Sequence, residues 1–106
     1  MQITIADALA KLQTQDSPFI ELFQHGTLSV ELYQPQKVDL QQPHTRDEVY
    51  VVFSGHGTFL LDGERMPFQP GDFLFVKAGL DHRFVDFSDD FLVWVFFYGP
   101  EGGESA

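Results

Sequence analysis

The 106-residue sequence contains no cysteine, and it has few basic residues and no long apolar run. Without cysteine, neither a disulfide framework nor a thiolate metal site is possible. Six basic residues against sixteen acidic ones give a net charge of −10, which would repel nucleic-acid phosphates and anionic lipids. No stretch reaches the roughly 18 apolar residues of a membrane-spanning helix, and the opening MQITIADALAKL lacks the basic-then-apolar order of a signal peptide. We therefore expect a cytoplasmic protein that binds neither nucleic acid nor membrane.

The length suits one domain over residues 1–106 and is too short for two. Residues 1–17 hold the one good helix candidate. There Thr4 and Asp7 resemble a capping box, and Ile5, Leu9 and Leu12 recur at helical spacing. We expect this short helix to pack across an open edge or mouth of a sheet, and residues 99–106 to form a frayed tail.

Between these ends, about residues 19–98, short β-type runs alternate with turn residues. The predicted strands are 19–23, 27–33, 49–53, 58–61, 65–68, 72–76, 82–87 and 91–98. Spacing of about ten residues with Gly and Pro turns indicates an all-β sandwich or barrel. The run LVWVFFY at 92–98 is apolar at both parities, so both faces of that strand should be covered, by the barrel interior and by the opposite sheet, the helix or a second subunit.

Three polar residues interrupt this apolar pattern at even positions: Gln42, His44 and Glu48. In an extended segment they would point to one face. His44 and Glu48 are also four residues apart, as on one face of a helix, but Pro43 and the following VYVVF favour a strand. Burying such groups unpaired would cost several kcal/mol, and a divalent cation would satisfy them.

His82 supplies a further imidazole 34 residues after Glu48. Two imidazoles, a carboxylate and an amide oxygen form a mixed nitrogen and oxygen donor set. Such a set suits one divalent transition metal, Fe, Mn, Ni, Zn or Co, better than calcium.

These segments resemble the two sequence motifs of the cupin superfamily. The first motif is met by Gln42, His44 and Glu48, followed by Gly55. The second is met by Gly71, Gly79 and His82, followed by Asp86. Two motifs at the proper separation are more specific than either alone. The resemblance covers about residues 19–98 and implies an antiparallel, double-sheet jelly-roll barrel with Gln42, His44, Glu48 and His82 as metal ligands. Small cupins commonly pair through sheet edges, which implies a homodimer.

The sequence departs from the cupin pattern at three positions. Lys77 stands for a proline and Asp86 for an asparagine, both at loop-shaping positions, and Gln42 stands for the first histidine. Phosphomannose isomerases, which are also cupins, have a Gln-x-His arrangement at a zinc site, so Gln42 is compatible with a metal. The alternative is a cupin that has lost its metal.

The resemblance implies a small organic molecule in the barrel and leaves the reaction open. With Fe(II), His44, Glu48 and His82 would fit a dioxygenase; with Zn(II) or Mn(II), the ion would act as a Lewis acid for an isomerase or lyase. No second carboxylate or histidine stands out as a general base, so the catalytic residues are unknown. The competing interpretations are a non-catalytic ligand-binding or sensing module, with or without metal, and a purely structural dimer.

Overall fold

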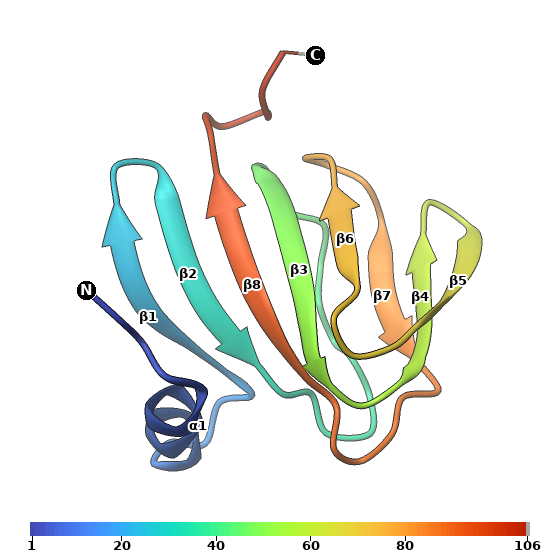
Figure 1. The fold of residues 1–106 in the computed structure, drawn as a ribbon. Coiled ribbons are helices and arrows are strands. Elements are labelled where there is room, and N and C mark those ends of the chain that lie inside the picture. Colours follow the sequence, from blue (N-terminus) through green and yellow to red (C-terminus); the bar gives the residue numbers. More distant parts are fainter. Residues whose placement is uncertain (106) are drawn as a thin grey trace.

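A computed structural model describes residues 1–105 of the chain, which form one helix and eight strands (Figure 1). The helix is α1 (Ile5–Gln13). The strands are β1 (Phe19–His25), β2 (Leu28–Tyr33), β3 (Asp47–Ser54), β4 (Gly57–Leu61), β5 (Glu64–Phe68), β6 (Phe73–Val76), β7 (His82–Val85) and β8 (Leu92–Tyr98). Within residues 1–105, no helix is long and apolar enough to cross a bilayer.

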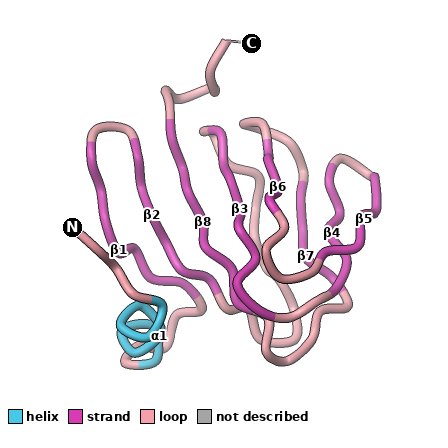
Figure 2. Tube along the Cα trace, viewed as in Figure 1, coloured by secondary structure: helices cyan, strands magenta, loops and turns pink. Residues whose placement is uncertain are grey.

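The strands form two antiparallel sheets (Figure 2). The larger sheet has the order β1-β2-β8-β3-β6, and the smaller has the order β5-β4-β7. β8, the last strand in the chain, therefore lies between β2 and β3. The predicted all-β, double-sheet jelly-roll barrel with one short N-terminal helix is confirmed.

Alternate residues of the larger sheet point into the barrel and meet the smaller sheet there. Tyr50 lies opposite Val95, and Val52 lies opposite Val93, in the pairing of β3 with β8. From the smaller sheet, Phe59 packs against Tyr50 with their ring centroids 5.8 Å apart. The buried core that results is shared by both sheets: Tyr33, Tyr50, Val52, Phe59, Phe68, Val76, Phe84, Phe91, Val93 and Val95.

The helix covers part of the outer face of the larger sheet. Its N-cap is Thr4, whose hydroxyl accepts a hydrogen bond from the backbone N–H of Asp7. Ala8 and Leu12 are buried against Leu32 and Leu92. The predicted helix is thus present, and it lies against β1, the edge strand of the larger sheet, and its neighbour β2 (Figure 1).

Two connections show why particular residues of the motifs are needed. Gly55 has φ +86°, and a Cβ there would lie 2.5 Å from the Cα of Phe91, so a larger residue would clash with the backbone. Asp86 has φ +52°, a left-handed conformation that Asp and Asn adopt more readily than most residues. The replacement of asparagine by aspartate therefore keeps the loop geometry.

The described part of the C-terminal tail, residues 99–105, is not frayed as expected. The backbone N–H groups of Gly102 and Glu104 donate to the carbonyl of Thr45 and to the carboxylate of Asp47. The same Asp47 carboxylate accepts from the N–H of Ala78. These bonds connect the tail to the first residue of β3 and to the loop before it.

Candidate metal centre

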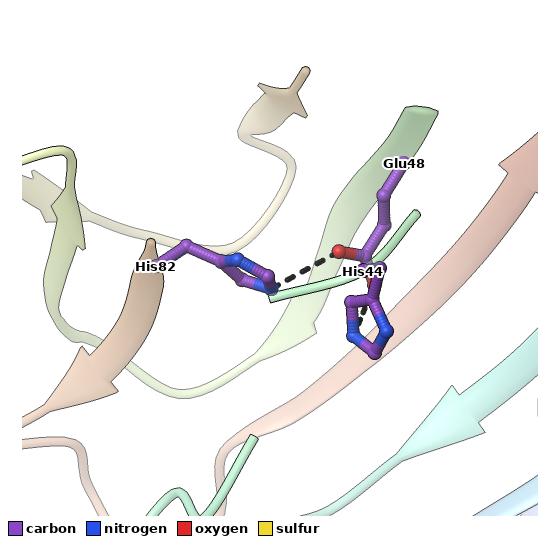
Figure 3. A group of neighbouring side chains, drawn as sticks. All are labelled: His44, Glu48 and His82. Carbon is purple, nitrogen blue, oxygen red and sulfur yellow. Dashed lines mark ion pairs between the residues drawn. The ribbon is translucent and has the colours of Figure 1, made fainter. Parts of the chain in front are cut away.

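The candidate site joins three side chains from different parts of the barrel (Figure 3). Glu48 is the second residue of β3, His82 is the first residue of β7, and His44 lies in the loop before β3. One ligand atom from each residue lies within 4.8 Å of the others. The fold therefore brings together residues from both sequence motifs.

The contacts within this group are close but do not satisfy the polar atoms. His82 Nε2 lies 3.1 Å from Glu48 Oε1, and His44 Nε2 lies 3.9 Å from Glu48 Oε2. The side chains of Glu48 and His82 are fully buried. Within residues 1–105, neither oxygen of Glu48 and neither of these Nε2 atoms makes a hydrogen bond of acceptable geometry. Buried polar atoms without partners are costly, and the four atoms that converge here belong to residues that could hold a metal ion.

The orientation of His82 is fixed by its other ring nitrogen. His82 Nδ1 lies 3.0 Å from the carbonyl oxygen of Leu80. A carbonyl can only accept, so Nδ1 carries the hydrogen and, in the neutral ring, Nε2 presents a lone pair toward Glu48. Metal-binding histidines are commonly oriented by this kind of bond.

The second imidazole is held by both backbone and ring contacts. The backbone N–H of Gly79 donates to the carbonyl oxygen of His44, and the ring of His44 packs edge-on against Phe97 at 4.8 Å. Burial lowers the pKa of His44, against the opposing attraction of Glu48. The neutral imidazole, the form that ligates metals, is therefore favoured.

A proton is the alternative to a metal between His82 and Glu48. Burial lowers the pKa of His82, but contact with the Glu48 carboxylate and the bond to Leu80 outweigh burial and raise it. A single proton would join only one imidazole to one carboxylate oxygen. A divalent cation would also engage His44 and the second oxygen, so it fits the three-residue arrangement better. Two imidazoles and one carboxylate suit Fe, Mn, Ni, Zn or Co.

A buried hydrogen-bond network centred on Asp39 supports this end of the barrel. Its carboxylate accepts from the Tyr33 hydroxyl, from the backbone N–H and side-chain amide of Gln41, and from the backbone N–H of Phe84. The Gln41 carbonyl accepts in turn from the Tyr50 hydroxyl. Asp39 therefore links β2, the loop that carries His44, and the free edge of β7. The sequence analysis did not identify this network.

A cavity of about 330 Å³ opens beside His44 and Glu48. It is lined by Phe19, Glu31, Tyr33, Gln41, His44, Glu48, Val95 and Phe97, and so contains no lysine or arginine side chain. Its volume lies at the small end of the range for ligand sites. A larger hollow of about 390 Å³ lies between α1 and residues 34–40 and is not lined by His44, Glu48 or His82.

Two of the predicted site residues, Gln42 and His44, do not lie on the strand where the sequence predicted them. β3 begins at Asp47, so Gln42 and His44 lie in a loop rather than on the strand. Gln42 is exposed, whereas its neighbour Gln41 lines the cavity. In the same loop, Arg46 is partly buried and donates to the carbonyl of Gly99. The strand does not extend back to these residues, because Pro43 and the hydrogen bonds of the loop to Gly79 and Gly102 interrupt it.

Comparison with known proteins identifies the class of this protein. The chain matches the cupin domain family over residues 29–98 and belongs to that family. It is 33% identical over 94 residues to an uncharacterized protein of Streptomyces coelicolor, a match covering 87% of this chain and 90% of that protein.

Solved structures share the fold at lower sequence identity. Protein NMB1881 from Neisseria meningitidis has a TM-score of 0.74 and 17% identity, covering 93% of this chain and 100% of that one. KdgF from Halomonas sp. has a TM-score of 0.65 and 22% identity, covering 77% and 78%. A candidate mannose-6-phosphate isomerase from Ralstonia eutropha has a TM-score of 0.63 and 23% identity, covering 80% and 86%.

Proposed function

We propose that this protein is a metal-dependent cupin enzyme that acts on a small organic molecule in the barrel. The observation that carries the proposal is the convergence of four buried ligand atoms without hydrogen-bond partners, on His44, Glu48 and His82, beside a cavity. When bound there, a divalent cation would supply a Lewis acid that polarises a ligand oxygen. With a single carboxylate ligand, the site would keep a net positive charge.

The residues of the chain would divide the remaining tasks. His44, Glu48 and His82 would hold the cation, while Phe97 and Val95 would exclude water from one side of the cavity. Gln41 is fixed by Asp39 and Tyr50, and its side-chain amide keeps one N–H beyond the bond to Asp39. That N–H is available to a ligand oxygen. Gln42 remains a proposed fourth ligand, which would require its loop to turn inward.

The lining of the cavity favours an uncharged ligand. A sugar phosphate, the type of substrate named for the Ralstonia eutropha protein, would find no lysine or arginine in the lining. A molecule that binds the cation through a carbonyl or hydroxyl oxygen and packs against Phe19 and Phe97 would fit better.

Oxygen chemistry is a second candidate, favoured by the two-histidine, one-carboxylate donor set. That set is typical of Fe(II) oxygenases with open coordination positions.

The test of both candidate functions is elemental analysis of protein purified anaerobically without chelators or a histidine tag. We expect about one equivalent of a transition metal, lost in His82→Ala and kept in His56→Ala, which alters an exposed turn histidine. Iron with substrate-dependent oxygen uptake would favour an oxygenase, and zinc or manganese would favour Lewis-acid chemistry. No metal after anaerobic soaking would leave a non-catalytic binding module as the better interpretation.

A homodimer is supported by exposed aromatic residues on the outer face of the larger sheet. Phe53 of β3 and Phe73 and Phe75 of β6 are 46%, 67% and 45% exposed. We propose that a second copy covers this patch, since clustered exposed aromatic residues typically mark an interface. Sedimentation equilibrium of the wild type should show a dimer that Phe73→Lys weakens. A monomer at micromolar concentration would contradict the proposal.

The cytoplasmic location and the single domain over residues 1–106 remain predictions.

A further inference from the structure

A second carboxylate, Glu31, lies on the wall of the metal-site cavity. It is at the middle of β2, where Val95 of β8 is its partner on one side and Glu21 of β1 on the other. Alternation along β2 places Glu31 on the same inner face as buried Tyr33. Glu31 lines the same cavity as His44 and Glu48. It therefore faces the space that a ligand of the metal would occupy.

Glu31 differs from the neighbouring carboxylates in its contacts. Glu21 accepts hydrogen bonds from Gln24 and Ser29. Within residues 1–105, Glu31 has neither a side-chain hydrogen bond nor an ion pair, and it is not among the residues close enough to form the metal group. Packing or pairing gives no reason for a carboxylate at this position.

The surroundings of Glu31 favour a carboxyl group that can both accept and return a proton. Burial, followed by repulsion from Glu21 and Glu48, raises its pKa from 4.5 to about 7. The two charged groups that raise this pKa, Glu21 on β1 and Glu48 on β3, are both acidic. The residues of β8 that line the cavity, Val95 and Phe97, are uncharged. A carboxyl group that titrates near neutrality is well matched to acid–base chemistry.

We propose that Glu31 transfers a proton to and from an uncharged carbonyl compound bound between it and the His44–Glu48–His82 group. This inference rests on the proposed metal-dependent function. A C–H bond next to the carbonyl breaks, its hydrogen becomes the carboxyl proton of Glu31, and the bonding electrons move toward the carbonyl oxygen. Return of the proton to the same or another atom gives exchange or isomerisation, so no oxidant or reductant is consumed.

The experiment follows hydrogen exchange in dihydroxyacetone, an uncharged probe that carries C–H bonds beside a carbonyl. Zn(II)-loaded protein is incubated with the probe in D₂O, and replacement of hydrogen by deuterium is followed by ¹H NMR. We expect exchange above the rate with Zn(II) in buffer, and a loss of about 100-fold or more in Glu31→Gln. Dihydroxyacetone phosphate, the charged counterpart, should exchange much more slowly because the cavity lining offers no cationic side chain.

Glu64→Gln is the matched control, because it makes the same chemical change at an exposed position on β5. It should keep wild-type exchange. Zn(II) affinity is measured in parallel by competition with a chromophoric chelator and should be within about threefold of wild type in both variants, since Glu31 is not in the ligand group. Failure of the wild type to bind Zn(II) would overturn the proposed function and this inference together. Normal Zn(II) binding with exchange unchanged in Glu31→Gln, or absent in the wild type, would overturn the inference alone.

A second readout does not depend on turnover. In metal-free protein labelled with ¹³C at the glutamate carboxyl carbons, the resonance missing from Glu31→Gln should titrate near pH 7. Titration near pH 4.5, the ordinary value, would show an unperturbed surface carboxylate and would contradict the role.

Discussion

The two ends of the barrel interior are built by the same strands but differ in chemistry. At one end, aromatic rings contact one another: Phe84 packs on Phe59, Phe68 and Phe91 with centroids 4.7–5.4 Å apart. At the other end, Glu48 and His82 approach each other with their polar atoms unsatisfied. β3 passes from Glu48 through Tyr50 to Val52, and β7 passes from His82 to Phe84, so each strand crosses from the polar end to the apolar end.

This difference indicates which part of the interior stabilises the fold and which part performs chemistry. Close aromatic packing stabilises the apolar end without any ligand. The polar end removes charged groups from water without compensating bonds, which reduces stability. Residues that break the local packing rules in this way are expected at functional sites. Substitutions at the apolar end should therefore lower the stability of the fold. Removal of a polar side chain at the other end should raise the stability of the metal-free protein and weaken metal binding.

The largest expected effect is at the apolar end. Phe84→Ala removes a ring that is 1% exposed, and we expect it to lower the free energy of unfolding by about 3–5 kcal/mol because a cavity remains. Urea denaturation measures the change, with the more conservative Phe84→Leu as the control that loses less. A decrease in the free energy of unfolding of less than about 1 kcal/mol would mean that packing at the apolar end contributes little to stability.

The second-largest expected effect is at Asp39, whose hydrogen bonds connect the polar end of the barrel interior with the apolar end. Asp39→Ala leaves the Tyr33 hydroxyl and the backbone N–H groups of Gln41 and Phe84 without their acceptor. We expect about 2–4 kcal/mol lower stability and, because the His44 loop loosens, roughly tenfold weaker Zn(II) binding. Denaturation and chelator competition measure the two effects. Asp39→Asn keeps one acceptor oxygen and should lose less of both; losses equal to those of Asp39→Ala would contradict the role of the acceptor oxygens.

At the polar end, removal of a ligand should raise the stability of metal-free protein. Glu48→Met in EDTA should be about 1–2 kcal/mol more stable than wild type at alkaline pH, since it removes an unsatisfied buried carboxylate. The raised pKa of His82 means that an imidazolium partner stabilises the wild type at pH below about 6.5, a contribution lost as pH rises through the raised value. The gain should therefore shrink at acidic pH. Lower stability of the variant at alkaline pH would contradict this account, as would retained Zn(II) affinity.

The smallest effect is expected at Glu31. Its pKa is about 7 in the folded protein against 4.5 as the ordinary value, so folding favours the protonated form and stability falls as pH rises from about 4.5 to 7. Glu31→Gln should therefore be more stable than wild type by about 1 kcal/mol at pH 8, where solvent screening limits the effect, and close to it at pH 4. Thermal unfolding in EDTA at both pH values measures this. The same difference at pH 4 and pH 8 would contradict the raised pKa.

The sequence predicts the strands and the family because both depend on local patterns. All eight predicted strands are present, and the two motifs that resemble cupins mark residues the fold brings together. The position of Gln42 could not be predicted from parity, since the loop before β3 takes its conformation from bonds to Gly79 and Gly102, far along the chain. Glu31 and Asp39 were not identified because each is a single acidic residue outside any motif. Asp39 is buried only where β2, the loop before β3 and β7 meet, and Glu31 lines the cavity only because β2 lies between β1 and β8.

The central claim is that the polar end of the barrel is a metal centre. The most direct measurement is a crystal structure of Zn(II)-loaded protein with anomalous diffraction recorded at the zinc edge. We predict one anomalous peak within about 2.0–2.2 Å of Nε2 of His44 and His82 and of a Glu48 oxygen. The same map would show whether Gln42 turns inward to coordinate. No peak at this group, or zinc bound only at the exposed His25 or His56, would contradict the claim.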